Sequence, residues 1–240
     1  MSEFKELWPD GPIFSYSERG FALGMDSVLL SDFADRGNFS RAADLGCGTG
    51  FLLVSLLYNN PKLSAVGAEI NKSAALSAEE NIRANSFDDR CEIICSDLRN
   101  YKEIFAPGSF DLVLCNPPYF KKGCGYSASD EKTKIAREDL HLDLDEICFC
   151  ASYICKNRGS FCMVMRTERL SETICTLSKH RLEPKRLRFI AKDEKTAPKL
   201  FLIEARLNAG VGLSVLPNLY LYDKNGDYSP EYRRIYHLEV

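Results

Sequence analysis

Apolar runs of strand length alternate with longer amphipathic segments from residue 41 onward, and this alternation predicts the fold class. The expected strands are 41–45, 63–70, 91–95, 110–115 and 160–165. The expected helices are 51–58, 71–84, 139–157 and 167–181, with Asn71 as the N-cap of the second. Strands and helices in this order are typical of an α/β domain with a mostly parallel sheet and helices on both faces.

The pattern changes on either side of this core. Residues 187–191 and 200–207 are apolar runs, and the polar segment 192–199 between them is too short for a helix. These runs predict an antiparallel hairpin at the C-terminal side of a seven-stranded sheet. Before the first strand, residues 26–33 have the spacing of an amphipathic helix that covers the sheet.

Composition narrows the class of protein. The 240 residues are expected to form a single domain, with a cap at 1–40, a core at 41–207 and an extension at 208–240. Hydrophobic residues make up 45% and charged residues 27%, which excludes a disordered, collagen-like or coiled-coil chain. No apolar run approaches the roughly 20 residues that span a bilayer, and the first residues lack a signal-peptide pattern. We therefore expect a cytoplasmic protein without a membrane partner, and slightly favour a monomer.

The ten cysteines suggest neither zinc nor disulfides, because their spacings include no C-x-x-C pair. Several lie within apolar runs, as Cys95 and Cys115 do. We expect most of them to be small buried hydrophobic residues in a reducing compartment, and we expect no metal site.

A glycine-rich segment, Asp44-Leu45-Gly46-Cys47-Gly48-Thr49-Gly50, joins the first expected strand to the first expected helix of the core. Glycines there let the backbone approach a ligand beside a helix N-terminus. Glu69 ends the second strand, where a carboxylate can accept both hydroxyls of a ribose, and Asp97 follows the third strand, near the adenine edge of a nucleoside. Asp44 would repel a pyrophosphate, but it suits the ammonium and sulfonium of S-adenosylmethionine.

The spacing of Asp44, the glycines, Glu69 and Asp97 resembles that of class I S-adenosylmethionine-dependent methyltransferases. The resemblance implies a Rossmann-like fold and S-adenosyl-L-methionine as the cofactor. The predicted cofactor-binding residues are Asp44, Leu45, Gly46, Cys47, Gly48, Gly50, Glu69, Ile70, Asp97, Leu98 and Asn116.

The tetrapeptide Asn116-Pro117-Pro118-Tyr119 directly follows the fourth expected strand. Two prolines fix an extended path. The Asn116 oxygen and a carbonyl of the Pro-Pro turn can then accept from one planar amino group and favour its attack on a methyl sulfonium. Tyr119 offers a face on which a base can stack. We predict these four residues as the catalytic set. They resemble methyltransferases that act on adenine N6, guanine N2 or a protein glutamine.

Outer segments extend the resemblance over nearly the whole chain. The stretches 16–30, 137–138, 166–170, 182–185 and 228–231 are similar to bacterial methyltransferases that make N6-methyladenine beside the anticodon of a valine tRNA. The resemblance implies tRNA as the partner, with target contacts at Asn116, Pro117 and Tyr119. Three alternatives stay open: the same chemistry on ribosomal RNA or DNA, the same chemistry on protein glutamine, or a non-catalytic RNA-binding protein on this scaffold.

The charge distribution is compatible with RNA. The formal net charge is −3, which argues against indiscriminate coating of nucleic acid. Local basic patches can still hold phosphates. Five basic residues follow Tyr119: Lys121, Lys122, Lys132, Lys134 and Arg137. Eight more lie between 179 and 199: Lys179, Arg181, Lys185, Arg186, Arg188, Lys192, Lys195 and Lys199.

Overall fold

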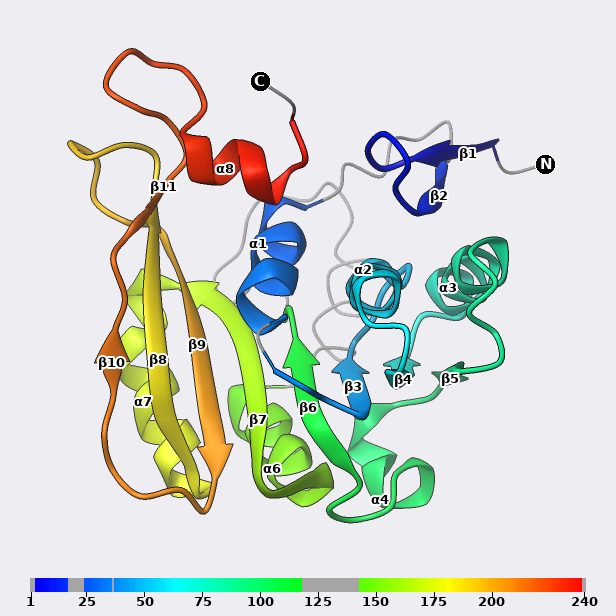
Figure 1. The fold of residues 1–240 in the computed structure, drawn as a ribbon. Helices are drawn as coiled ribbons and strands as arrows, with labels where there is room; N and C mark the ends of the chain where they lie inside the picture. Colours follow the sequence, from blue (N-terminus) through cyan, green and yellow to red (C-terminus); the bar gives the residue numbers. More distant parts are fainter. Residues whose placement is uncertain (1–2, 17–23, 36, 118–142, 239–240) are drawn as a thin grey trace, which may run out of the picture.

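A nine-stranded sheet with helices on both faces forms the centre of the molecule (Figure 1). The structure is a computed structural model, and it describes residues 3–16, 24–35, 37–117 and 143–238. The strand order is β10-β8-β9-β7-β6-β3-β4-β5, and β11 also pairs with β8. Strands β3 to β7 run parallel to one another, whereas β9 is antiparallel to both β7 and β8.

The elements have the following bounds. The strands of the sheet are β3 (Arg41–Leu45), β4 (Ser64–Glu69), β5 (Cys91–Cys95), β6 (Phe110–Cys115), β7 (Cys155–Arg166), β8 (Leu182–Ala191), β9 (Leu200–Leu207), β10 (Ser214–Val215) and β11 (Leu219–Tyr220). The α-helices are α1 (Met25–Ala34), α2 (Phe51–Asn59), α3 (Lys72–Ala84), α4 (Tyr101–Ile104), α6 (Leu144–Ile154), α7 (Leu170–Lys179) and α8 (Pro230–Ile235). Two 3₁₀ turns, η1 (Leu98–Asn100) and η2 (Thr167–Arg169), precede α4 and α7, and a separate hairpin comprises β1 (Glu3–Glu6) and β2 (Ile13–Tyr16).

Alternation along the strands builds two hydrophobic cores, one on each face of the sheet. In β3, Ala42 belongs to the core under α1, α2 and α3, whereas its neighbour Ala43 belongs to the core under α6 and α7. In β6, Leu112 belongs to the first of these cores and Val113 to the second. All four side chains are fully buried, which explains why these strands are continuous apolar runs rather than alternating ones.

The predicted fold class is confirmed, and strands β3, β5, β6 and β9 have the predicted bounds. The seven predicted strands are present, but the sheet gains β10 and β11, each of two residues and too short to leave a periodic pattern. The N-terminal hairpin was not predicted either, because its two strands have only four residues each. Residues 155–157 are strand rather than helix, and Cys155 pairs with Phe110 of β6. A register shift against β6 and a positive φ of 64° at Arg158 then follow within β7.

The prediction that most of the cysteines are buried is confirmed within the described residues. Six of the nine cysteines that the structure describes are buried and all nine are free, while Cys95 and Cys175 are exposed. Burial raises the pKa of Cys148 and of Cys150 to about 12, so these thiols behave as small apolar side chains. Within the described residues, no helix is long and apolar enough to cross a membrane.

Candidate active site

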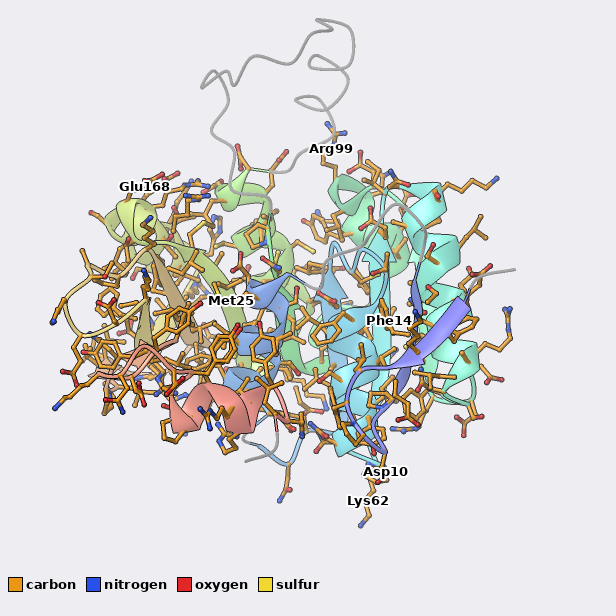
Figure 2. All side chains as sticks on the ribbon, turned by 90° about the horizontal axis from the view of Figure 1, so that it is seen from above. Asp10, Phe14, Met25, Lys62, Arg99 and Glu168 are labelled. Atoms are coloured by element: carbon orange, nitrogen blue, oxygen red, sulfur yellow. The ribbon has the colours of Figure 1, made fainter. Side chains whose placement is uncertain are left out.

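The acidic and amide residues singled out in the sequence come together at the carboxyl edge of the sheet. The order β6-β3-β4-β5 makes four parallel neighbours, so their carboxyl ends lie side by side. Asp44 pairs in register with Leu114 on one side and with Gly67 on the other. In open parallel sheets, ligands bind outside these carboxyl ends. Figure 2 looks down on this edge, with Met25 at the start of α1 and Arg99 on η1 both in view.

The glycine-rich loop between β3 and α2 is fixed to the sheet and open on one side. The backbone N–H groups of Gly46 and Cys47 both donate to the carbonyl of Ala68, at 2.9 and 3.0 Å. Gly46 and Gly48 have positive φ values of 80° and 55°, and no described atom lies within 4 Å of a Cβ added at either position. Their backbone therefore borders open space that a ligand can fill.

Gly50 has a different role from the other two glycines. Its φ is 85°, and an added Cβ would lie 3.2 Å from the Cβ of Ala78 on α3. Asn81, also on α3 and fully buried, donates from Nδ2 to the Thr49 carbonyl at 2.9 Å and accepts from the Ser15 N–H at 2.8 Å. The end of the loop is thus held by α3 and tied to the N-terminal hairpin.

Asp44 at the end of β3 is a buried carboxylate without a counter-group. Its exposed fraction is 1%, and neither oxygen has a hydrogen-bond partner among the described residues. Burial, with a smaller effect from the charge of Glu69, raises the pKa of Asp44 to about 8. An ionised carboxylate in such a place is costly unless a cation accompanies it. The site is therefore suited to a positively charged group.

Glu69 at the end of β4 is held in a fixed orientation. Its Oε2 accepts from the Gly48 N–H at 2.9 Å, and its Oε1 accepts from the Asn71 N–H at 2.7 Å. Asn71 caps α3, as predicted, by accepting from Ser73 and Ala74. Each carboxylate oxygen has a second acceptor site, so the two oxygens can still accept from a pair of hydroxyls.

Asp97 follows β5 and caps η1 by accepting from the Arg99 N–H at 2.9 Å. The Arg99 side chain also donates to both oxygens of Asp97, and this hydrogen bonding lowers the pKa of the carboxyl. Three apolar residues that were also predicted to bind the cofactor, Leu45, Cys47 and Leu98, have buried side chains. Ile70, after Glu69, is half-buried.

Asn116 directly follows β6, and its side chain contacts α1. Its Nδ2 donates to the Oγ of Ser27 at 2.8 Å, and the next residue, Pro117, is buried. Pro118 and Tyr119 lie outside the described residues, as do the basic residues of 121–137. Ser27 was not predicted as a site residue, although the stretch 16–30 that carried the family resemblance contains it.

The basic cluster of 179–199 divides into buried and exposed parts. Arg188 is 7% exposed and binds both carboxylate oxygens of Glu231, and Arg186 donates to Glu204. These two guanidinium groups are paired within the fold, so the prediction that they belong to a phosphate-holding patch is wrong. Lys179 is exposed at the end of α7 and pairs with Asp145 at 2.7 Å. Lys192, Lys195 and Lys199 are exposed in the turn between β8 and β9. A hydrogen bond from the Thr167 N–H to the Lys199 carbonyl ties this turn to the carboxyl end of β7.

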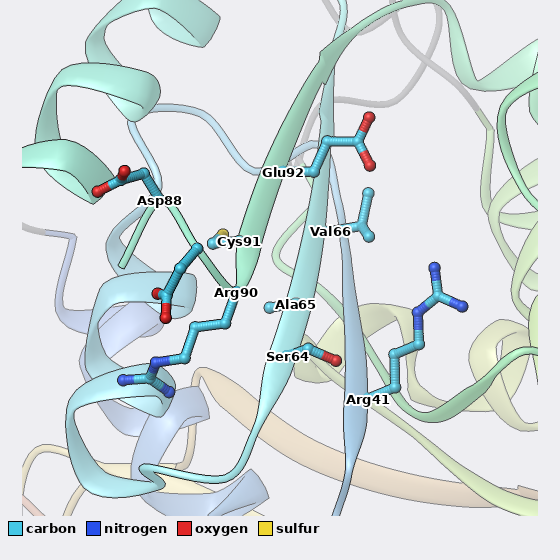
Figure 3. A pocket seen from close by; sticks show the side chains of 9 residues that line it. Arg41, Ser64, Ala65, Val66, Asp88, Arg90, Cys91 and Glu92 are labelled. Carbon is cyan, nitrogen blue, oxygen red and sulfur yellow. The ribbon is translucent and has the colours of Figure 1, made fainter. Parts of the chain in front are cut away.

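A cavity of about 320 Å³ lies away from this edge (Figure 3). Arg41, Ser64 and Cys91, which line it, are at the starts of β3, β4 and β5. Since the chemistry-bearing side chains lie at the ends of these strands, the cavity is separate from the candidate site.

Solved structures share this fold. A predicted O-methyltransferase from Agrobacterium tumefaciens matches with a TM-score of 0.71 at 18% sequence identity, covering 89% of this chain and 96% of that one. A geranyl diphosphate C-methyltransferase from Streptomyces coelicolor A3(2) matches with a TM-score of 0.54 at 14% identity, covering 75% of this chain and 74% of that one. The fold is therefore that of the class I methyltransferases.

Sequence comparison gives the family. The family model "methyltransferase small domain" matches residues 12–142, more than half of the chain, and the chain belongs to this family of methyltransferases. Two similar proteins are named tRNA1(Val) (adenine(37)-N6)-methyltransferase. The one from Porphyromonas gingivalis is 29% identical over 233 residues, covering 92% of this chain and 90% of the relative. The one from Bacteroides thetaiotaomicron is 27% identical over 215 residues, with coverages of 89% and 87%.

Proposed function

We propose that this methyltransferase transfers the methyl group of S-adenosylmethionine to N6 of an adenine in tRNA, next to the anticodon of tRNA-Val. The observation that carries the chemistry is the position of Asn116, directly after β6 and beside the open glycine-rich loop of β3. The choice of substrate rests on the relatives that carry this activity in their names and extend over about nine tenths of the chain.

The residues of the carboxyl edge fit this cofactor. S-adenosylmethionine carries an ammonium and a sulfonium, and the unpartnered Asp44 carboxylate supplies a buried negative charge. Gly46 and Gly48 leave room for close approach. Glu69 would accept from the ribose hydroxyls, and Asp97 from the adenine amine. When bound, the cofactor supplies an electrophilic methyl group.

The protein's part in the reaction is to present the amine. The lone pair of an exocyclic amine is delocalised into the ring, so the nitrogen is a weak nucleophile. The Oδ1 of Asn116 and the carbonyl of Pro117 would accept its two hydrogens and favour a geometry in which the nitrogen can attack. As a nitrogen–carbon bond forms and the carbon–sulfur bond breaks, the displaced proton leaves to solvent. Tyr119 is predicted to stack against the base.

Exposed lysines near this edge are consistent with an RNA substrate. Lys192, Lys195 and Lys199 lie in the turn between β8 and β9, tied to the carboxyl end of β7 through Thr167. Cations in this position can contact phosphates while the target base enters the site. A cytoplasmic location and a monomeric state remain predictions from the sequence.

The test combines the purified protein, S-adenosylmethionine and an unmodified tRNA-Val transcript, with nucleosides analysed by mass spectrometry. We expect N6-methyladenosine to appear at the position next to the anticodon. Asn116→Ala should lower turnover about 10²- to 10³-fold, as the loss of a transition-state acceptor does, and keep cofactor affinity within about twofold. Asn218→Ala, at an exposed asparagine of the C-terminal segment, is the matched control and should leave turnover unchanged.

Two results would change the proposal. Stabilisation by S-adenosylhomocysteine without methylation of tRNA would reject this substrate and direct the assay to ribosomal RNA, DNA and protein glutamine. Absence of stabilisation in a thermal-shift assay would instead favour a non-catalytic RNA-binding protein, because a ligand that binds the native state must raise its melting temperature.

A further inference from the structure

The hydrogen bond between α1 and the candidate catalytic asparagine joins residues 89 positions apart in the chain. Ser27 lies in the first turn of α1, and Leu29 and Leu30 in the next turn are 1% and 0% exposed, so the helix is anchored in the core. The Ser27 hydroxyl accepts from the Nδ2 of Asn116 at 2.8 Å. A rigid element thus contacts one end of a side chain whose other end carries the proposed acceptor.

The backbone around Asn116 is fixed, but its amide can still rotate. Cys115 before it is 2% exposed and its Sγ donates to the Leu45 carbonyl at 3.2 Å, while Pro117 after it is buried and has a restricted φ. The last torsion of an asparagine is broad and permits exchange of the oxygen and the nitrogen. Only contacts of the amide itself decide which of the two atoms faces the substrate.

The orientation of the amide matters because its two ends have opposite hydrogen-bonding character. Oδ1 only accepts and Nδ2 only donates, whereas the target amine must donate its hydrogens. If the amide were flipped, the hydrogens of Nδ2 would face the hydrogens of the target amine, and no hydrogen bond could form between them. In the structure the hydrogen bond to the Ser27 hydroxyl holds the amide with Nδ2 toward α1, which leaves Oδ1 on the other side.

We propose that Ser27 is a positioning residue for the methyl-transfer reaction, acting through the amide orientation of Asn116. This inference rests on the proposed function, since it requires that Asn116 accept a hydrogen bond from an amine. It adds a residue outside the Asn-Pro-Pro-Tyr segment to the site and gives α1 a role beyond covering the sheet.

Three variants of α1 separate this role from a merely structural one. Ser27→Ala removes the hydroxyl, and Ser27→Thr keeps it. Ser31→Ala is the matched control, because Ser31 lies one turn further on the same helix and its hydroxyl pairs with Ser55 at 2.8 Å, away from Asn116. A general weakening of α1 would affect the Ser27→Ala and Ser31→Ala proteins alike.

We expect Ser27→Ala to lower kcat about tenfold, the effect of one hydrogen bond, with KM values for tRNA and cofactor within about twofold. Ser27→Thr should recover most of this loss. Ser31→Ala should lower the melting temperature without lowering kcat. An unchanged kcat in Ser27→Ala, or an equal loss in Ser31→Ala, would overturn the proposal.

A second measurement does not depend on the substrate. In protein labelled with ¹⁵N-asparagine, the side-chain NH₂ signals of Asn116 can be assigned by their loss in Asn116→Ala. Ser27→Ala should shift these signals and Ser31→Ala should leave them in place. Unshifted signals would overturn the proposal even if the enzyme is active. If tRNA is not methylated, the proposed function fails, and these signals alone still decide whether Ser27 orients the amide.

Discussion

Two buried carboxylates lie in the same sheet with opposite surroundings. Asp44 on β3 is 1% exposed and has no hydrogen-bond partner among the described residues. Glu204 on β9 is 4% exposed and accepts from the hydroxyl of Ser160 at 2.9 Å and from the guanidinium groups of Arg186 and Arg206. Burial is thus almost equal, and the difference lies in what each carboxylate contacts.

The pKa values of the two groups move in opposite directions. Burial, and secondarily the charge of Glu69, raises the pKa of Asp44 from 3.8 to about 8. Burial acts in the same direction on Glu204, but hydrogen bonds from Arg206 and Ser160 and the charge of Arg186 outweigh it, and the pKa of Glu204 is lowered. Glu204 completes an internal network, whereas Asp44 is a buried acid with no partner among the described residues, and under the proposed function a bound cation would supply its counter-charge.

The largest expected effect concerns Glu204. Glu204→Ala removes the carboxylate that accepts from Arg186, Arg206 and the buried Ser160. Because Arg206 is half exposed and Arg186 keeps its hydrogen bond to the Phe33 carbonyl, we expect the free energy of unfolding to fall by about 3 kcal/mol, the lower end for a broken buried pair. Urea denaturation measures this loss. Cofactor affinity of the folded fraction should be unchanged, because Glu204 is on the antiparallel side of the sheet. Reduced affinity without reduced stability would contradict the division of roles.

The converse effect is expected at Asp44. Asp44→Asn keeps the shape of the side chain but removes the charge, so S-adenosylmethionine should bind about 30- to 150-fold more weakly, corresponding to about 2–3 kcal/mol. Above pH 8, the ligand-free variant should be more stable than the wild type, since the wild type must then bury an ionised group. Calorimetric titration and denaturation at pH 8.5 give the two values. Lower stability with unchanged affinity would identify Asp44 as a structural residue.

The comparison also explains what could be predicted from the sequence. Asp44, Glu69, Asp97 and Asn116 each follow or end an apolar strand, and parallel strands place their carboxyl ends at one edge, so their convergence follows from the alternation alone. The alternation does not show which of these groups already has a hydrogen-bond partner. Arg99, only two positions from Asp97, binds that carboxylate, whereas no described residue binds Asp44.

Long-range side-chain contacts were beyond prediction for a related reason. The sequence placed Arg188 in a basic patch that can hold phosphates, because its partner Glu231 is 43 positions away and no local pattern shows that the apolar stem of this arginine is buried. Ser27 and Asn116 are 89 positions apart. Periodicity places each residue on an element, but a contact between two elements depends on how their faces pack, which no local pattern encodes.

The smallest effect is a proton exchanged when the cofactor binds, and it tests the sign of the pKa shift at Asp44. Between pH 4 and 8 the folded, ligand-free protein holds this proton while the unfolded chain has lost it, so Asp44 makes stability fall as the pH rises. Glu204 has the opposite effect on stability. Its stabilising contribution is present above its ordinary pKa of 4.5 and is lost as the pH falls through its lowered pKa.

A bound cation favours the ionised form of Asp44. Binding of S-adenosylmethionine at pH 7 should therefore release up to about one proton from the protein. Titration calorimetry in two buffers of different ionisation enthalpy measures this number directly. Asp44→Asn should abolish the release, and Glu204→Gln should leave it intact if the variant remains folded. Proton uptake, or a release that persists in Asp44→Asn, would mean that Asp44 is already ionised in the free protein and that another group responds to the ligand.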